Sequence, residues 1–197
     1  MIVAVIDSGV QRAHPHILAD RVLSGVAVAA DGALTPGHDA DRLGHGTAVT
    51  AAIQSHAPEA LVLPVRVFHE ALRASPRALI AAIDWAAGQG AGLINLSLGT
   101  TNPAHAPHFA AAVARCPARI VAPRIALDQP CWPGMVEGVL AVGLDWDLPR
   151  DAFRVADGVI LASGHPRPIP GVPQRRNLHG VSFATANVCG LAAAGLV

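Results

Sequence analysis

Three short motifs, far apart in the sequence, carry the side chains that an acyl-transfer reaction needs. Asp7 is followed by Ser-Gly, His45 lies between two glycines, and Ser182 stands in a Gly-Val-Ser segment. Acyl transfer requires a nucleophile, a base that accepts its proton, and a carboxylate that orients the base. Aspartate, histidine and serine in this chain order are one arrangement in which such triads occur. The sequence therefore predicts a catalytic triad of Asp7, His45 and Ser182.

The surroundings of the histidine and the serine favour the same chemistry. Both residues precede helix-like stretches, and the neighbouring glycines let the backbone turn sharply and approach a substrate closely. A serine at a helix amino end also places backbone N–H groups and the positive end of the helix dipole near a developing oxyanion. Each motif alone is weak, because serine is a common helix cap. The prediction depends on finding all three together.

Alternating elements along the chain indicate how these residues are positioned. Short apolar runs predict strands at 2–6, 61–68, 93–98, 119–122, 138–143 and 158–162. Helix-like stretches cover 45–55, 76–88, 109–115 and 182–196, and surface loops are expected at 24–44 and 163–179. This alternation predicts an α/β doubly wound, mostly parallel sheet. Active groups of such sheets collect at the carboxyl ends of strands, where both Asp7 and residues 97–99 fall.

Bulk composition excludes several other classes of function. The 197 residues suit a single domain, 1–197, and the formal net charge of zero gives no reason to expect nucleic acid or a membrane as a partner. Three scattered cysteines predict neither a disulfide framework nor a zinc site. No leader-like segment or long apolar run is present, so we expect a cytoplasmic protein. A nucleotide-binding protein is disfavoured because glycine-rich phosphate loops are missing.

A family resemblance follows from the ordered motifs. The segments 3–10, 44–49, 94–99, 139–143, 157–164 and 180–190 are similar to those of the subtilases, the subtilisin-like serine peptidases. The resemblance implies a minimal subtilisin-like domain in which Asp7 orients the general base His45 and Ser182 is the nucleophile. It further implies that Ser97, Leu98 and Gly99 form the edge that pairs with an extended substrate, as in strand addition.

Two departures from the family pattern bear on activity. The family usually has an asparagine that donates to the oxyanion, but the aligned position here is Ala126, and no asparagine lies between Asn102 and Asn177. Arg124 is either a substitute donor or, as we favour, a solvated loop residue. Asp39 and Asp41 alone fall short of the ligands that calcium needs, so we expect neither a metal nor a cofactor.

These observations predict a serine endopeptidase that works through an acyl-enzyme on a peptide or protein substrate. Because neither a leader nor an inhibitory propeptide is visible, we expect narrow access, such as processing of one precursor peptide or dependence on a dedicated protein partner. A transamidase or macrocyclase would use the same residues. A degenerate homologue that binds peptides without cleaving them is the alternative from another class.

Overall fold

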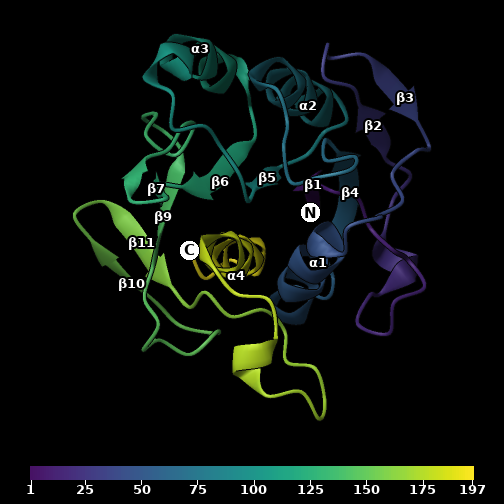
Figure 1. The fold of residues 1–197 in the computed structure, drawn as a ribbon, viewed down its shortest axis with the longest axis vertical. Coiled ribbons are helices and arrows are strands. Elements are labelled where there is room, and N and C mark those ends of the chain that lie inside the picture. Colours follow the sequence, from purple (N-terminus) through teal and green to yellow (C-terminus); the bar gives the residue numbers. More distant parts are fainter.

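A nine-stranded sheet forms the centre of the computed structural model, which describes residues 1–197 (Figure 1). Its strands are β1 (Ile2–Asp7), β2 (Val26–Val28), β3 (Leu34–Pro36), β4 (Leu61–Arg66), β5 (Leu93–Leu96), β6 (Arg119–Pro123), β9 (Leu140–Leu144), β10 (Phe153–Ala156) and β11 (Val159–Ala162). Their order is β10-β11-β9-β6-β5-β1-β4-β2-β3. The inner strands run parallel, and β10 and β3 pair antiparallel at the two edges.

Helices cover both faces of this sheet, which confirms the predicted α/β class (Figure 1). The α-helices are α1 (His45–His56), α2 (Pro76–Gly88), α3 (Ala106–Arg115) and α4 (Val181–Ala193). Single 3₁₀ turns occupy Ala19–Arg21, Pro103–His105 and Gln174–Arg176, and a separate small hairpin joins β7 (Ile125–Ala126) to β8 (Gln129–Pro130). No helix is long and apolar enough to span a membrane.

Strand alternation determines which face receives the functional side chains. In β1, Ala4 and Ile6 belong to the core under α2 and α3, whereas Val3 and Val5 belong to the core under α1 and α4. Because successive side chains of a strand point to opposite faces, Asp7 points to the same face as Val3 and Val5. The carboxylate therefore ends the strand on the side where α1 begins with His45.

The predicted loop at 24–44 is wrong in part, because it contains β2 and β3. All three residues of β2 are buried, and the strand lies parallel to β4. Tertiary pairing orders a three-residue segment that is too short for its pattern to stand out. The strand β10 and the β7–β8 hairpin were likewise not predicted, whereas the predicted helices match α1 to α4 within a few residues.

Candidate active site

The Asp7–His45 contact depends on two glycines that bracket the histidine. Gly44 caps α1 with a φ of 83°, a left-handed conformation that glycine adopts without strain. A Cβ on Gly46 would lie 2.3 Å from the carbonyl oxygen of Gly9, so a larger residue would push α1 away from the end of β1. The Gly46 amide instead donates to Ser8 Oγ at 2.8 Å. The first turn of α1 is thereby held against the aspartate segment.

Asp7 and His45 form a buried, oriented pair. Asp7 is fully buried, and its Oδ1 and Oδ2 lie 2.8 and 3.0 Å from Nδ1 of His45. Because the carboxylate accepts, we assign the imidazole proton to Nδ1, which leaves Nε2 free to act as a base. Burial by itself lowers the pKa of His45, but the hydrogen bond to Asp7 and the negative charges of Asp7 and Asp41 outweigh it and raise the pKa.

Ser182 is the second residue of α4, and a hydrogen-bonded pair ties it to the end of β5. Ser97 Oγ donates to the carbonyl oxygen of Ser182 at 2.9 Å, and Ser182 Oγ donates to the carbonyl oxygen of Ser97 at 3.0 Å. The Ser97 hydroxyl in turn accepts from Nδ2 of Asn95 at 2.9 Å. Early N–H groups of a helix have no partner within it, so the Ser182 amide is available for an oxyanion.

The structure brings the predicted triad segments to one place, although Ser182 and His45 share no hydrogen bond. The ring of Phe183, next to Ser182, lies 5.5 Å from the His45 ring between centroids. The Ser182 hydroxyl is directed to Ser97 instead. Rotation about its Cα–Cβ bond is the movement that would redirect the hydroxyl towards Nε2.

The predicted substrate edge, residues 97–99, follows β5 directly. Ser97 contacts Ser182 as described, and Leu98 packs against the core under α2 and α3. Thr100 forms an antiparallel bridge with Trp132 through two backbone hydrogen bonds of 2.9 Å. A Cβ on Gly99 would lie 2.4 Å from the Trp132 carbonyl oxygen, so this approach requires glycine. Substrate pairing along this edge stays a prediction.

A cavity of about 470 Å³ places Ala126 close to the serine segment. Ala126 and Arg124 line it together with Val181, the residue before Ser182. The alignment that put Ala126 at the position of the oxyanion asparagine is therefore spatially reasonable. The methyl group of Ala126 offers no hydrogen bond to an oxyanion, whereas the partly buried Arg124 lines the same cavity and carries donor groups.

Two residues that contribute to the site were missed from the sequence. Asn95 supports Ser97 from a fully buried position, and its placement two residues earlier on the same strand face was the available signal. Asp41 accepts from the amides of Leu43, Gly44 and Thr47 and adds negative charge near His45. No group of three or more His, Cys, Asp or Glu side chains is arranged to hold a metal.

Comparison with known proteins assigns the family. The model of the Subtilase family matches residues 1–126, which include Asp7 and His45 but end before Ser182. The chain belongs to the subtilase family. Thermitase from Thermoactinomyces vulgaris is 39% identical over 106 residues, which cover 50% of this chain and 37% of thermitase. This subtilase chain therefore spans well under half of that curated relative.

Solved structures similar to this subtilase extend over nearly its whole length. The prenylagaramide maturation protease PagA is 27% identical with a TM-score of 0.70, covering 98% of this chain and 73% of PagA. The nisin leader peptidase NisP from Lactococcus lactis is 20% identical with a TM-score of 0.75, covering 98% and 76%. These likenesses confirm the predicted subtilisin-like fold.

Proposed function

We propose that this subtilase is a serine endopeptidase that hydrolyses peptide bonds through an acyl-enzyme on Ser182. The observation that carries the proposal is the Asp7–His45 pair, which fixes the imidazole with Nε2 free. The placement of Ser182 at the amino end of α4 adds a nucleophile beside a set of backbone donors. Membership of a family of serine peptidases supports the same reaction.

The reaction proceeds through acylation and deacylation, and in each half His45 accepts one proton and gives one back. Nε2 accepts the proton of Ser182 Oγ as that oxygen attacks the scissile carbonyl carbon, and the carbonyl electrons move to the oxyanion. When the tetrahedral intermediate collapses, the C–N bond breaks and His45 gives its proton to the leaving amine. Water then attacks the acyl-enzyme by the same route, releasing the acid and restoring Ser182. Asp7 holds the imidazole and stabilises its charged form.

Substrate binding gives the Ser97 carbonyl a second role. An extended peptide that adds along residues 97–99 offers backbone N–H groups to this edge, where the Ser97 carbonyl now accepts from the Ser182 hydroxyl. Competition for that carbonyl would favour the rotamer in which Ser182 donates to His45. Binding of a fitting peptide and activation of the nucleophile would then be coupled.

We further propose that the substrate is a specific precursor peptide. PagA, a maturation protease, resembles this chain over 98% of this chain's length at 27% identity. The Ser182 hydroxyl donates to the Ser97 carbonyl until a substrate competes for that carbonyl. This arrangement suits an enzyme that acts only on a substrate that fits the edge well. Degradation of casein by the purified protein at rates near those of general proteases would contradict this narrower proposal.

One observation favours the non-cleaving alternative. Removing the side-chain oxyanion donor of subtilisin lowers turnover by about 10²–10³, and Ala126 provides no such donor here. A peptide-binding homologue without catalysis fits that loss, although the oriented Asp7–His45 pair has no evident use in binding. A transamidase would differ only in the amine that accepts the acyl group, so analysis of the products distinguishes it.

Labelling with a fluorophosphonate probe tests the proposal directly. An activated serine attacks the phosphorus, so we expect covalent labelling of the wild-type protein and none of Ser182→Ala. Peptide mapping of the adduct should identify Ser182. Ser163→Ala, which alters another buried serine, serves as the control and should label normally. Folded wild-type protein that does not label would support the peptide-binding alternative.

A further inference from the structure

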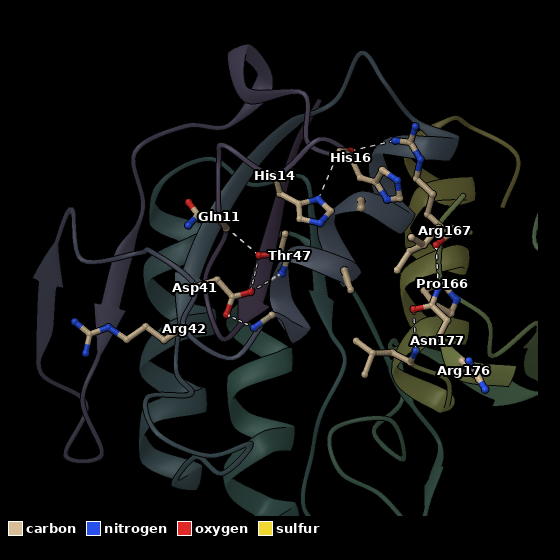
Figure 2. A pocket seen from close by; sticks show the side chains of 15 residues that line it. Gln11, His14, His16, Asp41, Arg42, Thr47, Pro166, Arg167, Arg176 and Asn177 are labelled. Carbon is tan, nitrogen blue, oxygen red and sulfur yellow. Dashed lines mark hydrogen bonds between the residues drawn. The ribbon is translucent and has the colours of Figure 1, made fainter. Parts of the chain in front are cut away.

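A second cavity, of about 450 Å³, opens beside α1 and is lined by segments that each connect to a triad residue (Figure 2). One wall is the loop that follows β1 and Asp7. A second is the stretch 41–51, which contains His45. The third is the loop 166–178, which leads into α4 and Ser182. The lining itself contains none of the three triad residues, so only a peptide that extends beyond the triad would reach this cavity.

Two small side chains of α1 and three arginines belong to the lining of this cavity. Ala48 and Ala51 lie about one turn apart on α1 and present only methyl groups to the cavity. Arg42, Arg167 and Arg176 line it, and none of the three forms an ion pair. In Figure 2, Arg42 and Arg176 lie on opposite sides of the cavity with their guanidinium groups turned outward to solvent, whereas Arg167 reaches towards His16.

The carboxylate in the cavity wall, Asp41, is already occupied by internal hydrogen bonds. Its Oδ1 accepts from the amides of Leu43 and Gly44, and its Oδ2 accepts from the amide and hydroxyl of Thr47. Burial alone would raise the pKa of Asp41, but these hydrogen bonds together hold it below the ordinary value. Asp41 thus stays ionised, and its single negative charge offsets only part of the positive charge of the three arginines that line the cavity.

Two histidines of the cavity wall lie close to Arg167. His14 and His16 line the cavity with their rings 5.3 Å apart. Arg167 donates to the carbonyl oxygen of His16 at 3.1 Å. Burial, followed by the positive charges of Arg167 and His14, lowers the pKa of His16. A negatively charged ligand would be attracted by the three arginines of the cavity lining, which outnumber its one carboxylate, Asp41.

From this geometry we propose that the cavity is a substrate subsite for a carboxylate of the bound peptide. The carboxylate comes either from an aspartate or glutamate side chain or from the peptide's C-terminus. The volume accommodates more than one side chain, so an acidic stretch is the better fit. This inference rests on the proposed peptidase function and names the chemical class of its substrate.

Binding is measured on Ser182→Ala protein, so that no cleavage interferes. The probes are fluorescein-labelled peptides of alternating Glu and Ala and of alternating Gln and Ala, each with a free or an amidated C-terminus. By fluorescence anisotropy, we expect the Glu peptide to bind roughly tenfold more tightly, with the difference shrinking as salt is added. Preference for the free terminus in the Gln peptide alone would assign the site to the C-terminus.

Charge-removing variants locate the binding. Arg42→Gln with Arg176→Gln should weaken binding of the Glu peptide by roughly threefold to tenfold. Arg175→Gln is the matched control, because it removes an exposed charge next to Arg176 from outside the cavity lining. Equal binding of all peptides, no measurable binding, or equal losses in the control and the double variant would each overturn the proposal. Probe labelling of the wild type tests the peptidase function separately.

Discussion

Two hydrogen-bonded pairs meet at the candidate active site, and only one of them is already arranged for the proposed proton transfer. The Asp7–His45 pair is complete: both carboxylate oxygens lie within 3.0 Å of Nδ1, and the base atom is free. The Ser97–Ser182 pair is equally close, but it directs the hydroxyl proton of Ser182, the proposed nucleophile, to a backbone carbonyl. In the proposed mechanism, one pair prepares the base, and the other anchors the nucleophile to the edge where substrate is expected.

The difference shows where control of the reaction would act. A buried carboxylate and its histidine are held by the first turn of α1, and a substrate has little to add there. The serine hydroxyl needs only a rotamer change, which lies within the reach of substrate binding. Mutations at the Asp7–His45 pair should therefore cause large losses of rate. Mutations at the Ser97–Ser182 pair should cause smaller ones.

The largest effect is expected from Asp7→Asn, which disables the prepared pair. An amide of the same size stabilises the wrong tautomer of His45 and no longer supports the imidazolium, which lowered turnover about 10⁴-fold in the corresponding trypsin variant. We expect a comparable loss in the second-order rate of fluorophosphonate labelling. Asp84→Asn, at an exposed ion pair with Arg115, should label at the wild-type rate. A loss below tenfold for Asp7→Asn would mean that the pair does not prepare the base.

A gain is expected when the nucleophile side receives the donor it lacks. Ala126→Asn places an amide in the cavity next to Val181, and the donor it supplies should raise the labelling or turnover rate by about 10²-fold. Ala126→Leu has a similar size without a donor and should not accelerate the reaction. Equal rates for the two variants would show that position 126 does not face the oxyanion.

Arg124 offers the competing explanation on the same side. If it already donates to the oxyanion, Arg124→Ala should lower turnover much more than substrate affinity. We expect instead an unchanged rate, because Arg124 is partly exposed beside the β7–β8 hairpin. A fall in turnover would assign the donor to Arg124 and would explain a weak response to Ala126→Asn.

The sequence predicted the parts of the site that depend on strand and helix boundaries. Asp7 at a strand end and His45 and Ser182 at helix starts could be read from apolar runs and glycines, because these patterns are local. The parallel sheet followed from the same alternation. The antiparallel edge strand β3 and the hairpin β7–β8 could not be read, because short exposed strands are specified by their partners.

Side-chain partners at the serine were also beyond the sequence. Asn95 and Ser97 have polar side chains that fit an ordinary strand end, and only tertiary contact shows that they hold α4. The cavity beside α1 arises from three separated segments, so no local pattern could indicate it. Its basic residues, read singly, are unremarkable surface arginines and histidines.

The pH dependence should report the prepared pair. His45 must be neutral to accept a proton, and its pKa is raised above the ordinary 6.5, so activity should fall about tenfold per pH unit below a midpoint that exceeds 6.5. The same shift stabilises the fold fully below 6.5 and loses that contribution as the pH rises through the folded pKa. An NMR titration of the His45 ring in Ser182→Ala measures the midpoint. A value at or below 6.5 would contradict the role of Asp7.

The smallest loss of rate among the site contacts is expected from Ser97→Ala, which tests whether the hydrogen bond between Ser97 and Ser182 is adjustable. The variant removes the donor to the Ser182 carbonyl and leaves the buried amide of Asn95 without its partner, so unfolding free energy should fall by about 1–3 kcal/mol. The backbone carbonyl that accepts from Ser182 Oγ remains, so labelling should slow only several-fold. Thr185→Val removes another buried hydroxyl bond of α4 away from Ser97; it should lower stability by about 1 kcal/mol without slowing the labelling. Equal rates for the two variants would make the Ser97 bond a structural contact only, whereas a selective loss in Ser97→Ala would show that the anchor positions the nucleophile.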